Sequence, residues 1–151
     1  MLYTIITLKT LDLWSSAIAD DGATDLSYML LDNTTLEVVN LGNNLISCIG
    51  AKFLADMLEK NTTLKVLDLS DNTIGTEGAS HLAIALKTNS KLRTLNLSSN
   101  KMLQEGVTCL IKALDINKAI TALSLRANKV PSMEIIRLKE SKDFDPLRIQ
   151  L

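Results

Sequence analysis

The sequence contains few of the side chains that carry out chemistry. Its 151 residues include two cysteines and one histidine, and aromatic residues make up 3% of the chain. Cys48 and Cys109 are too far apart to form a metal-binding motif, and His81 has no partner at a spacing that suits a metal or a catalytic pair. So few cysteines favour a reducing compartment. We therefore expect a cytoplasmic, intracellular protein, with the nucleus open as a second location.

Long runs of one kind are also absent from the sequence. No apolar run approaches the length of a membrane span, and the N-terminus lacks the basic start and the cleavage site of a secretory signal. The net charge is −1, with no long run of either sign, which predicts no binding to nucleic acid or to membranes. There is no glycine-rich phosphate loop and no nucleophile elbow. We therefore expect no cofactor and no enzyme activity.

What the sequence does contain is a repeat. Residues 64–74 read LKVLDLSDNTI, which is a frame of Leu-x-x-Leu-x-Leu-x-x-Asn-x-Ile. The same frame recurs every 28 residues, starting at Leu8, Leu36, Leu64, Leu92 and Ile120. A constant period of this length is typical of a solenoid, in which each copy buries its apolar face against its neighbours. Residues 1–142 are therefore predicted to form a single domain.

The first half of each copy predicts a strand followed by an asparagine. Leu67 and Leu69 alternate with residues of the opposite face, as in a short strand with one buried side. The asparagine that follows lies between buried positions, so its amide needs hydrogen-bonding partners on the backbone of an adjacent copy. The predicted asparagine ladder is Asn44, Asn72, Asn100 and Asn128. Ser16 stands at this position in the first copy, which predicts a weaker ladder at the N-terminal end.

The second half of each copy has the spacing of a helix. After Gly50, apolar residues follow at positions 51, 54, 55 and 58, and the same pattern follows Gly78 and Gly106. An asparagine stands near the end of each helix, at positions 33, 61, 89 and 117. Asparagine accepts the left-handed conformation that commonly closes a helix. Each copy is therefore predicted to fold as strand, turn, helix and turn.

The two ends depart from this frame. Met1 and Leu2 align with the end of a helix, so the solenoid is expected to start without an N-terminal cap, and an open apolar end favours self-association. After Val130 the pattern diverges. Residues 132–142 predict a capping helix with Ser132 as its N-cap, and residues 143–151 predict a C-terminal tail. Whether that tail packs on the solenoid stays open, although it carries Phe144.

These motifs resemble leucine-rich repeats of the ribonuclease-inhibitor type. The resemblance rests on the 28-residue unit, the leucine frame with its asparagine, and the helix motif GA-x-x-LA-x-AL at residues 78–86, and it covers residues 8–130. It implies an α/β fold, a right-handed leucine-rich repeat solenoid with a curved parallel sheet on its concave side and helices on its convex side. Extracellular members of the family usually carry cysteine-rich caps, which this sequence lacks.

Proteins with these repeats usually bind partners across the concave face or its flanking loops, although a merely solvated face is the alternative. The strand frame places eight candidate contact residues there: Asp12, Asn40, Asp68 and Asn96 in a central row, and Trp14, Ser70, Ser98 and Arg126 beside it. Trp14, the only tryptophan, is either an interface anchor or a cover for the open end of the solenoid. Arg126 either contacts an anion or is a solvated surface residue.

The leading hypothesis is a non-catalytic protein–protein interaction module that binds a protein partner on its concave sheet face. The repeat subtype leaves two alternatives. One is a small-GTPase regulator like the Ran GTPase-activating proteins, although we find no arginine in the loop context expected of that family. The other is a ligand-sensing fragment of a cytoplasmic nucleotide-binding immune receptor. Tropomodulin-like actin capping also uses a short repeat array, but we identify no distinctive actin-binding segment.

Overall fold

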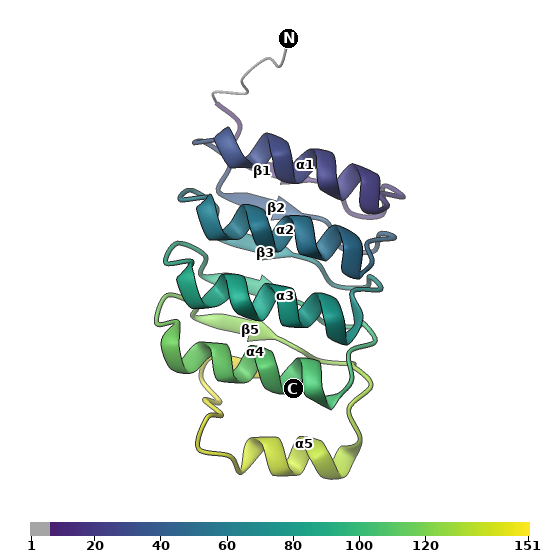
Figure 1. Cartoon of the computed structure of the whole chain (residues 1–151), viewed down its shortest axis with the longest axis vertical. Coiled ribbons are helices and arrows are strands. Elements are labelled where there is room, and N and C mark those ends of the chain that lie inside the picture. The colour runs from purple at the N-terminus through teal and green to yellow at the C-terminus, as the bar shows by residue number, and fades with distance from the viewer. Residues whose placement is uncertain (1–6) are drawn as a thin grey trace.

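The computed structural model describes residues 7–151, in which strands and helices alternate along the chain (Figure 1). The strands are β1 (Thr10–Asp12), β2 (Val38–Asn40), β3 (Val66–Asp68), β4 (Thr94–Asn96), β5 (Ala122–Ser124) and β6 (Ile149–Gln150). The helices are α1 (Asp20–Asp32), α2 (Cys48–Lys60), α3 (Gly75–Thr88), α4 (Gln104–Ile116) and α5 (Ser132–Lys139). No helix within these residues is long and apolar enough to cross a lipid bilayer.

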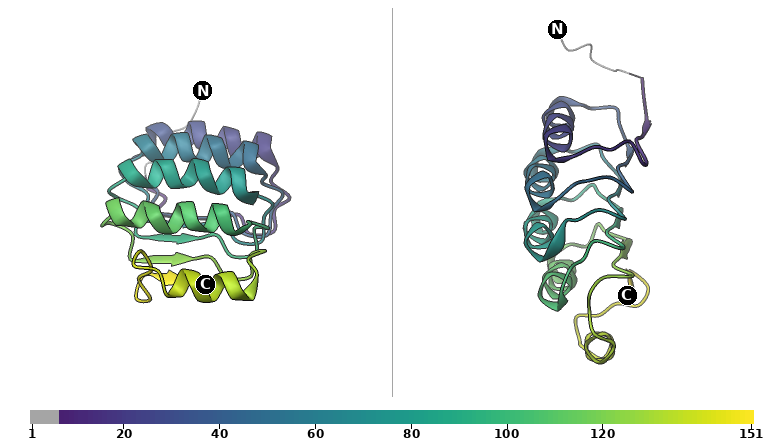
Figure 2. Two further views of the ribbon diagram at one scale, coloured as in Figure 1. Left: turned by 60° about the horizontal axis from the view of Figure 1, so that its bottom comes forward. Right: turned by 90° about the vertical axis from the view of Figure 1, so that its right-hand side faces the viewer.

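The strands form one parallel sheet whose spatial order follows the chain, β1 to β6. From β1 to β5 each residue pairs with the residue 28 positions later, as Leu67 does with Leu95. Helices α1 to α4 cover one face of the sheet in a second layer and leave the other face uncovered (Figure 2). The predicted α/β leucine-rich repeat solenoid is therefore confirmed, with each copy stacked on its neighbours in sequence order.

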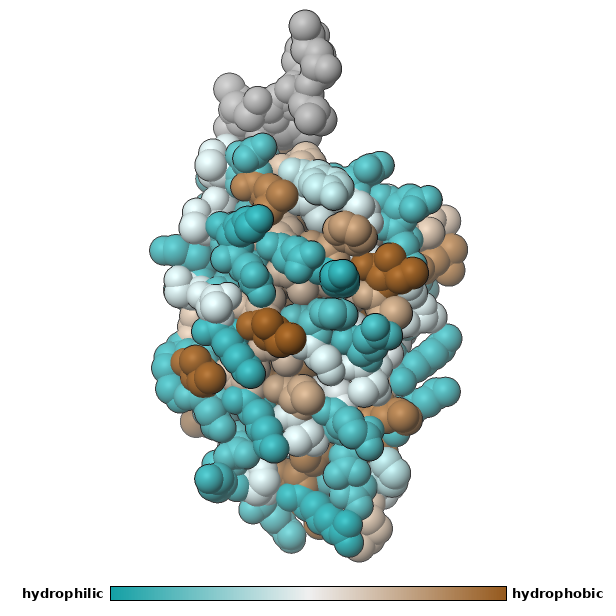
Figure 3. All heavy atoms as spheres, in the orientation of Figure 1, coloured by the Kyte–Doolittle hydropathy of each residue, from teal (hydrophilic) through white to brown (hydrophobic). Residues whose placement is uncertain are grey.

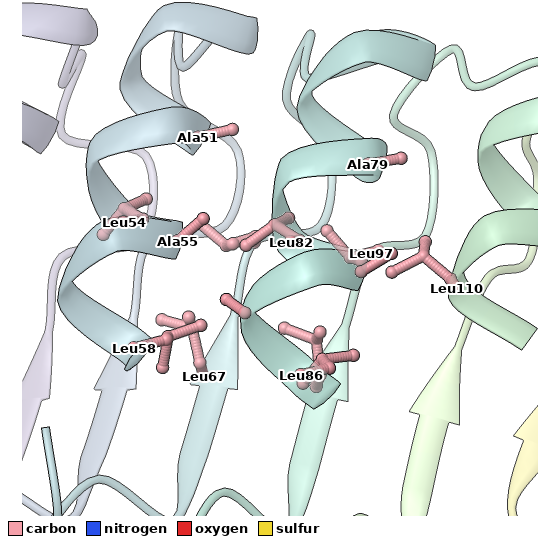
Figure 4. Packing of buried hydrophobic residues seen from close by; sticks show 14 of the residues in the cluster. Ala51, Leu54, Ala55, Leu58, Leu67, Ala79, Leu82, Leu86, Leu97 and Leu110 are labelled. Carbon is pink, nitrogen blue, oxygen red and sulfur yellow. The ribbon is translucent and has the colours of Figure 1, made fainter. Parts of the chain in front are cut away.

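The core lies between the sheet and helices α1 to α4, and leucines from both layers fill it (Figure 4). Leu67 of β3, Leu58 of α2 and Leu82 of α3 are fully buried. Adjacent helices approach closely where the repeated glycine stands, because a Cβ on Gly78 would lie 3.0 Å from Ala51 Cβ and 3.2 Å from Cys48 Cα, both in α2. The glycine thus lies in the first helical turn, as predicted, and sets how tightly the repeats stack.

The asparagine ladder is formed as predicted. Asn72 Oδ1 accepts a hydrogen bond from the backbone N–H of Ile46 at 3.0 Å, and its Nδ2 donates to the carbonyls of Leu41 and Leu69 at 2.9 and 3.1 Å. One side chain therefore joins two repeats at the edge where the strands end. The equivalent bonds of Asn44 reach back to the first repeat, where its Oδ1 accepts from the backbone N–H of Ser16.

A second asparagine ladder follows the helices. Asn61 Oδ1 accepts from the backbone N–H of Leu64 at 2.8 Å, and its Nδ2 donates to the Leu30 carbonyl of the preceding repeat at 2.7 Å. The prediction that these residues close the helices in a left-handed conformation is wrong, because Asn61 has φ −66° and ψ 129°. Its equivalents Asn33, Asn89 and Asn117 are extended too. The side-chain bonds, rather than a left-handed backbone, select asparagine here.

Residues after Val130 differ in detail from the prediction. Helix α5 ends at Lys139, three residues early, and Pro131 rather than Ser132 occupies its N-cap position. The segment predicted to be a tail folds back on the solenoid, since Ile149 is buried and pairs with Leu123 as part of β6. This last pairing spans 26 residues instead of 28, so the sixth strand is out of phase with the others. The predicted helix end at Met1 and Leu2 lies outside the described residues.

Candidate functional site

The outer face of the sheet, which the helices leave uncovered, is the candidate site, and we call it the sheet face. Its central row consists of Asp12, Asn40, Asp68, Asn96 and Ser124, one residue from each of β1 to β5. The first four share one arrangement, in which Oδ1 accepts a hydrogen bond from the backbone N–H two residues later, at 2.8–3.1 Å. These side chains therefore cap the backbone at the strand ends and are not simply solvated. Among these four only Asp12 is exposed, and the other three are half-buried.

The C-terminal half of this row is a closed hydrogen-bond network. Asn96 Nδ2 donates to Asp68 Oδ2 at 2.9 Å, and the hydroxyl of Ser70 donates to Asp68 Oδ1 at 2.6 Å. Ser98 bonds Asn96 Oδ1 and the hydroxyl of Ser124, each at 2.8 Å. Ser70, one of the predicted contact residues, is only 4% exposed, and its hydroxyl is taken up by Asp68. Ser98 is half-buried.

The N-terminal half of the row is open by comparison. Asp12 and Asn40 each use Oδ1 to bond the backbone, but in the described chain Asp12 Oδ2 accepts no hydrogen bond and Asn40 Nδ2 donates none. The equivalent pair, Asp68 and Asn96, is joined through these same two atoms. An acceptor, Asp12 Oδ2, and a donor, Asn40 Nδ2, therefore remain available to a partner. They lie on adjacent strands, which are about 5 Å apart in any sheet.

Trp14 lies beside this open pair and is 46% exposed. A Cβ added to Gly42 would lie 2.3 Å from its Cζ3 and 2.4 Å from its Cε3, so the indole ring rests on the glycine of the second repeat. Trp14 was predicted to be either an interface anchor or a cover for the open end of the solenoid. Its ring lies toward the second repeat, so it does not cover the open end. Because Gly42 has no side chain, the ring packs directly against its backbone.

A charged row borders the sheet face on the side where the strands begin. Glu37 accepts hydrogen bonds from Lys65 at 2.6 Å and from Lys9 at 3.1 Å, which joins three successive repeats. The two ammonium groups hold the pKa of Glu37 below its ordinary value. Arg93 follows in this row, but its guanidinium bonds the carbonyls of its own loop, among them that of Lys91 at 3.0 Å. The two lysines and Arg93 are exposed and Glu37 is only partly buried, so these surface ion pairs add little to the stability of the fold.

Four successive stretches of the sequence match one family of repeats. Residues 5–27, 32–55, 60–83 and 88–110 match the sequence profile described as Leucine Rich repeat. The chain belongs to the leucine-rich repeat family. No curated protein sequence matches it significantly.

Solved leucine-rich repeat structures share its fold. A structure described as leiomodin-1 actin-binding site 2 superposes with a TM-score of 0.76 at 20% identity, over 89% of this chain and 80% of that one. The tropomodulin C-terminal domain of Caenorhabditis elegans superposes with a TM-score of 0.75 at 15% identity, over 91% of this chain and 83% of that one. At these identities the likeness is one of fold.

The helix side of this leucine-rich repeat chain is mostly hydrophilic, with separated hydrophobic side chains (Figure 3). The rings of Tyr28 in α1 and Phe53 in α2 lie 6.2 Å apart, so Phe53 packs against the neighbouring helix. A cavity of about 170 Å³ lies beside them, lined also by Asp56 and Lys60. His81 is half-buried on the same side, and residues 7–151 contain no group of side chains that could hold a metal ion.

Asp20 has a capping role that the repeat pattern does not predict. It belongs to α1, but Oδ1 accepts hydrogen bonds from the backbone N–H groups of Ser47 at 2.8 Å and Gly50 at 2.9 Å, and Oδ2 accepts from the Ser47 hydroxyl at 2.5 Å. Burial works to raise the pKa of Asp20, but these bonds outweigh it and lower the pKa below its ordinary value. Asp20 therefore caps the start of α2 from the preceding repeat.

Proposed function

We propose that this leucine-rich repeat chain is a non-catalytic interaction module that binds a protein partner on its sheet face. One observation supports this choice of surface. Trp14 is half-exposed beside a carboxylate oxygen of Asp12 and an amide of Asn40 that make no hydrogen bond within residues 7–151. Tryptophan is enriched among the residues that dominate binding energy, and polar groups free to pair give such an anchor its orientation.

The arrangement favours a partner with three features. An apolar side chain would pack on Trp14, a hydrogen-bond donor would reach Asp12 Oδ2, and an acceptor would reach Asn40 Nδ2. Because the strands are about 5 Å apart, the N–H and C=O of an extended peptide segment would match the last two. The C-terminal half of the face, where Asp68 and Asn96 bond each other, offers less for a partner to satisfy.

The test keeps the fold and removes the proposed contacts. Exchanging Asp12→Asn with Asn40→Asp preserves both Oδ1 caps and the net charge while it reverses the two free groups. Trp14→Ser removes the anchor, and Ile84→Ser, which removes a 55%-exposed side chain from α3 on the helix side, is its matched control. We expect capture of a specific partner from a cell lysate to be lost with the first two variants and kept with Ile84→Ser. Loss with Ile84→Ser alone would place the contact on the helix side.

Actin is the first named partner to try, because one structural neighbour is described as an actin-binding site and its fold matches 89% of this chain. Binding to monomeric actin and co-sedimentation with filaments would both be measured with wild-type protein. Actin binding that is lost in Trp14→Ser would indicate that actin contacts the sheet face. No binding in either assay would remove actin and leave the sheet face for another protein partner.

The proposed location is the cytoplasm. Cys48 and Cys109 are free thiols in different repeats, which fits a reducing compartment. Imaging of the tagged chain in intact cells would test this, and a signal confined to secretory compartments would contradict it.

A further inference from the structure

Three basic side chains stand together at one edge of the solenoid. Lys101 and Lys129 occupy the same frame position in successive repeats, in the loops that follow β4 and β5, and Arg126 lies in the second of these loops. Backbone hydrogen bonds hold the two loops side by side. Ser99 N–H donates to the Arg126 carbonyl at 2.9 Å. Lys129 N–H donates to the Met102 carbonyl at 2.8 Å. We call Lys101, Arg126 and Lys129 the basic edge.

The basic edge carries no acidic side chain of its own. Its three side chains are exposed, and none of them forms an ion pair within residues 7–151. Residues 98–103 and 126–131 contain no aspartate or glutamate and together carry a net charge of +3. The equivalent loops of the first three repeats contain no lysine or arginine. The positive charge is therefore a feature of this one place in the solenoid and not of the repeat.

Acidic groups on the neighbouring elements leave the basic edge unpaired. Asp71 of the preceding loop and Glu105 in the first turn of α4 are exposed, but neither forms an ion pair in the described chain. Glu134 of α5 is already paired within its own helix, at 2.6 Å. The two lysines of the basic edge therefore repel each other across adjacent loops with no ion pair to offset the repulsion. An anion bound beside them would offset it.

The loop of Lys101 also offers a free backbone donor. At this frame position the N–H groups of Leu45, Thr73 and Lys129 each donate to a carbonyl of the preceding repeat, at 2.8–2.9 Å. The corresponding acceptor for Lys101 would be the carbonyl of Ile74, which has already entered the helical conformation at φ −58° and ψ −38°. Lys101 N–H makes no hydrogen bond within residues 7–151. A backbone N–H beside cationic side chains is a good donor for a carboxylate oxygen.

We infer that the basic edge binds an acidic segment of a protein partner, in which neighbouring carboxylates pair with Lys101, Arg126 and Lys129. Of the two roles open to Arg126 in the sequence, this is the contact with an anion. A short run of aspartate or glutamate fits the size of the edge, which spans two repeats. Because the whole chain has a net charge of −1, the residues outside these two loops carry −4 and would repel a long polyanion such as a nucleic acid. Neither loop has an aromatic side chain on which a base could stack.

The basic edge lies far from Trp14 along the sheet face. Trp14 and Arg126 hold the same frame position four repeats apart, and strands about 5 Å apart place them roughly 20 Å from each other. The inference therefore does not rest on the proposed function, and each can be tested without the other.

Fluorescence anisotropy of a labelled hexaglutamate peptide tests the basic edge directly, with hexaglutamine as the neutral peptide. The edge variant removes all three charges through Lys101→Gln, Arg126→Gln and Lys129→Gln. Its matched control removes three exposed charges from helices α2, α3 and α4 through Lys52→Gln, Lys87→Gln and Lys112→Gln. All six side chains are exposed, so both variants are expected to fold, which a thermal melt would check.

We expect hexaglutamate to bind wild type, the control and Trp14→Ser with similar affinity, and to bind less tightly at high salt. The edge variant should raise the dissociation constant about tenfold, which is the combined effect of three exposed ion pairs. No saturable binding by wild type, or equal weakening in the edge variant and the control, would overturn the inference. Loss of binding in Trp14→Ser would overturn it too, because the peptide would then occupy the sheet face. A single-stranded oligothymidine that binds the basic edge more tightly than the peptide would overturn the choice of a protein segment.

Discussion

The carboxylate of Asp145 and the guanidinium of Arg148 divide between them the hydrogen bonds that a single asparagine, Asn61, Asn89 or Asn117, makes in each inner repeat. Asp145 Oδ1 accepts from the backbone N–H of Leu147 at 2.9 Å, which is the acceptor half of the pattern. Arg148 Nη1 and Nη2 donate to the carbonyls of Leu114 and Asn117 at 3.4 and 2.6 Å, which is the donor half. These carbonyls lie 31 and 28 residues before Asp145, the same spacing that Asn117 uses.

Arg148→Leu should therefore destabilise the C-terminal end. It removes the side-chain donor to the partly buried carbonyls of Asn117 and Ile120, and unmade bonds of this kind cost about 1–3 kcal/mol. Adding Asp145→Asn supplies an amide at the place of the other ladder residues, so the double variant should recover part of the loss. Urea unfolding of both variants measures this as a coupling energy. Additive effects of the two changes would contradict the shared role.

The pH dependence of stability should show the contribution of Asp20. Its pKa is lower in the folded chain than its ordinary value of 3.8, because Ser47 and Gly50 donate hydrogen bonds to its carboxylate. A group with a lowered folded pKa stabilises the fold above its unfolded pKa and loses that effect as pH falls through the folded value. Wild type should exceed Asp20→Asn in unfolding free energy at pH 7, and the gap should shrink below about pH 4. A gap independent of pH would contradict the assignment.

The asparagine ladder should be strong in its middle and weak at its start. Asn72→Ala removes bonds to Ile46, Leu41 and Leu69 from a 3%-exposed site and should cost about 3 kcal/mol of unfolding free energy. Ser16→Ala changes an exposed side chain whose hydroxyl makes one 3.4 Å bond to Trp14, and it should be close to neutral. Thermal or urea unfolding distinguishes the two, and equal effects would count against the ladder.

Gly42→Ala should displace the indole of Trp14, since the added Cβ would lie 2.3 Å from Cζ3. Trp14 is the only tryptophan, so its fluorescence reports this one contact. We expect the emission maximum to shift to longer wavelength as the ring moves into water. Gly75→Asn is the control, because its Cβ meets nothing within 4 Å and asparagine tolerates the φ of +64° found there. An unchanged spectrum in Gly42→Ala would place the ring elsewhere.

The regular part of the fold was predictable because one period fixes both strand pairing and burial. Leu67, Asn72 and Gly78 each recur every 28 residues, so each role could be inferred from chemistry that several copies share. The repeating asparagine at position 61 was recognised too, but its conformation was predicted wrongly. Its side chain bonds a carbonyl 31 residues earlier, and a local rule about helix ends contains no information on that contact.

The candidate site was less predictable, because the repeat frame indicates the face to which each side chain points but not the hydrogen bonds that it makes. Asp68 and Asp12 occupy the same position, yet Asp68 accepts a bond from Asn96 while Asp12 Oδ2 accepts none among the described residues. Replacing the central row by alanine would therefore remove backbone caps together with any contact to a partner. The role of Arg148 could not be inferred from the repeat, because β6 pairs with the strand residues 26 rather than 28 positions earlier.

The two asparagine ladders run along opposite edges of the stack and have a mechanical consequence. A pull along the axis would load both edges at every junction between inner repeats, so these junctions should resist force together. The last junction is different, because within residues 7–151 no asparagine of the first ladder joins β5 to β6, and Asp145 with Arg148 replaces the asparagine of the second ladder. Stretched from its ends, the solenoid should therefore open first between β5 and β6, and its gain in length would record that step.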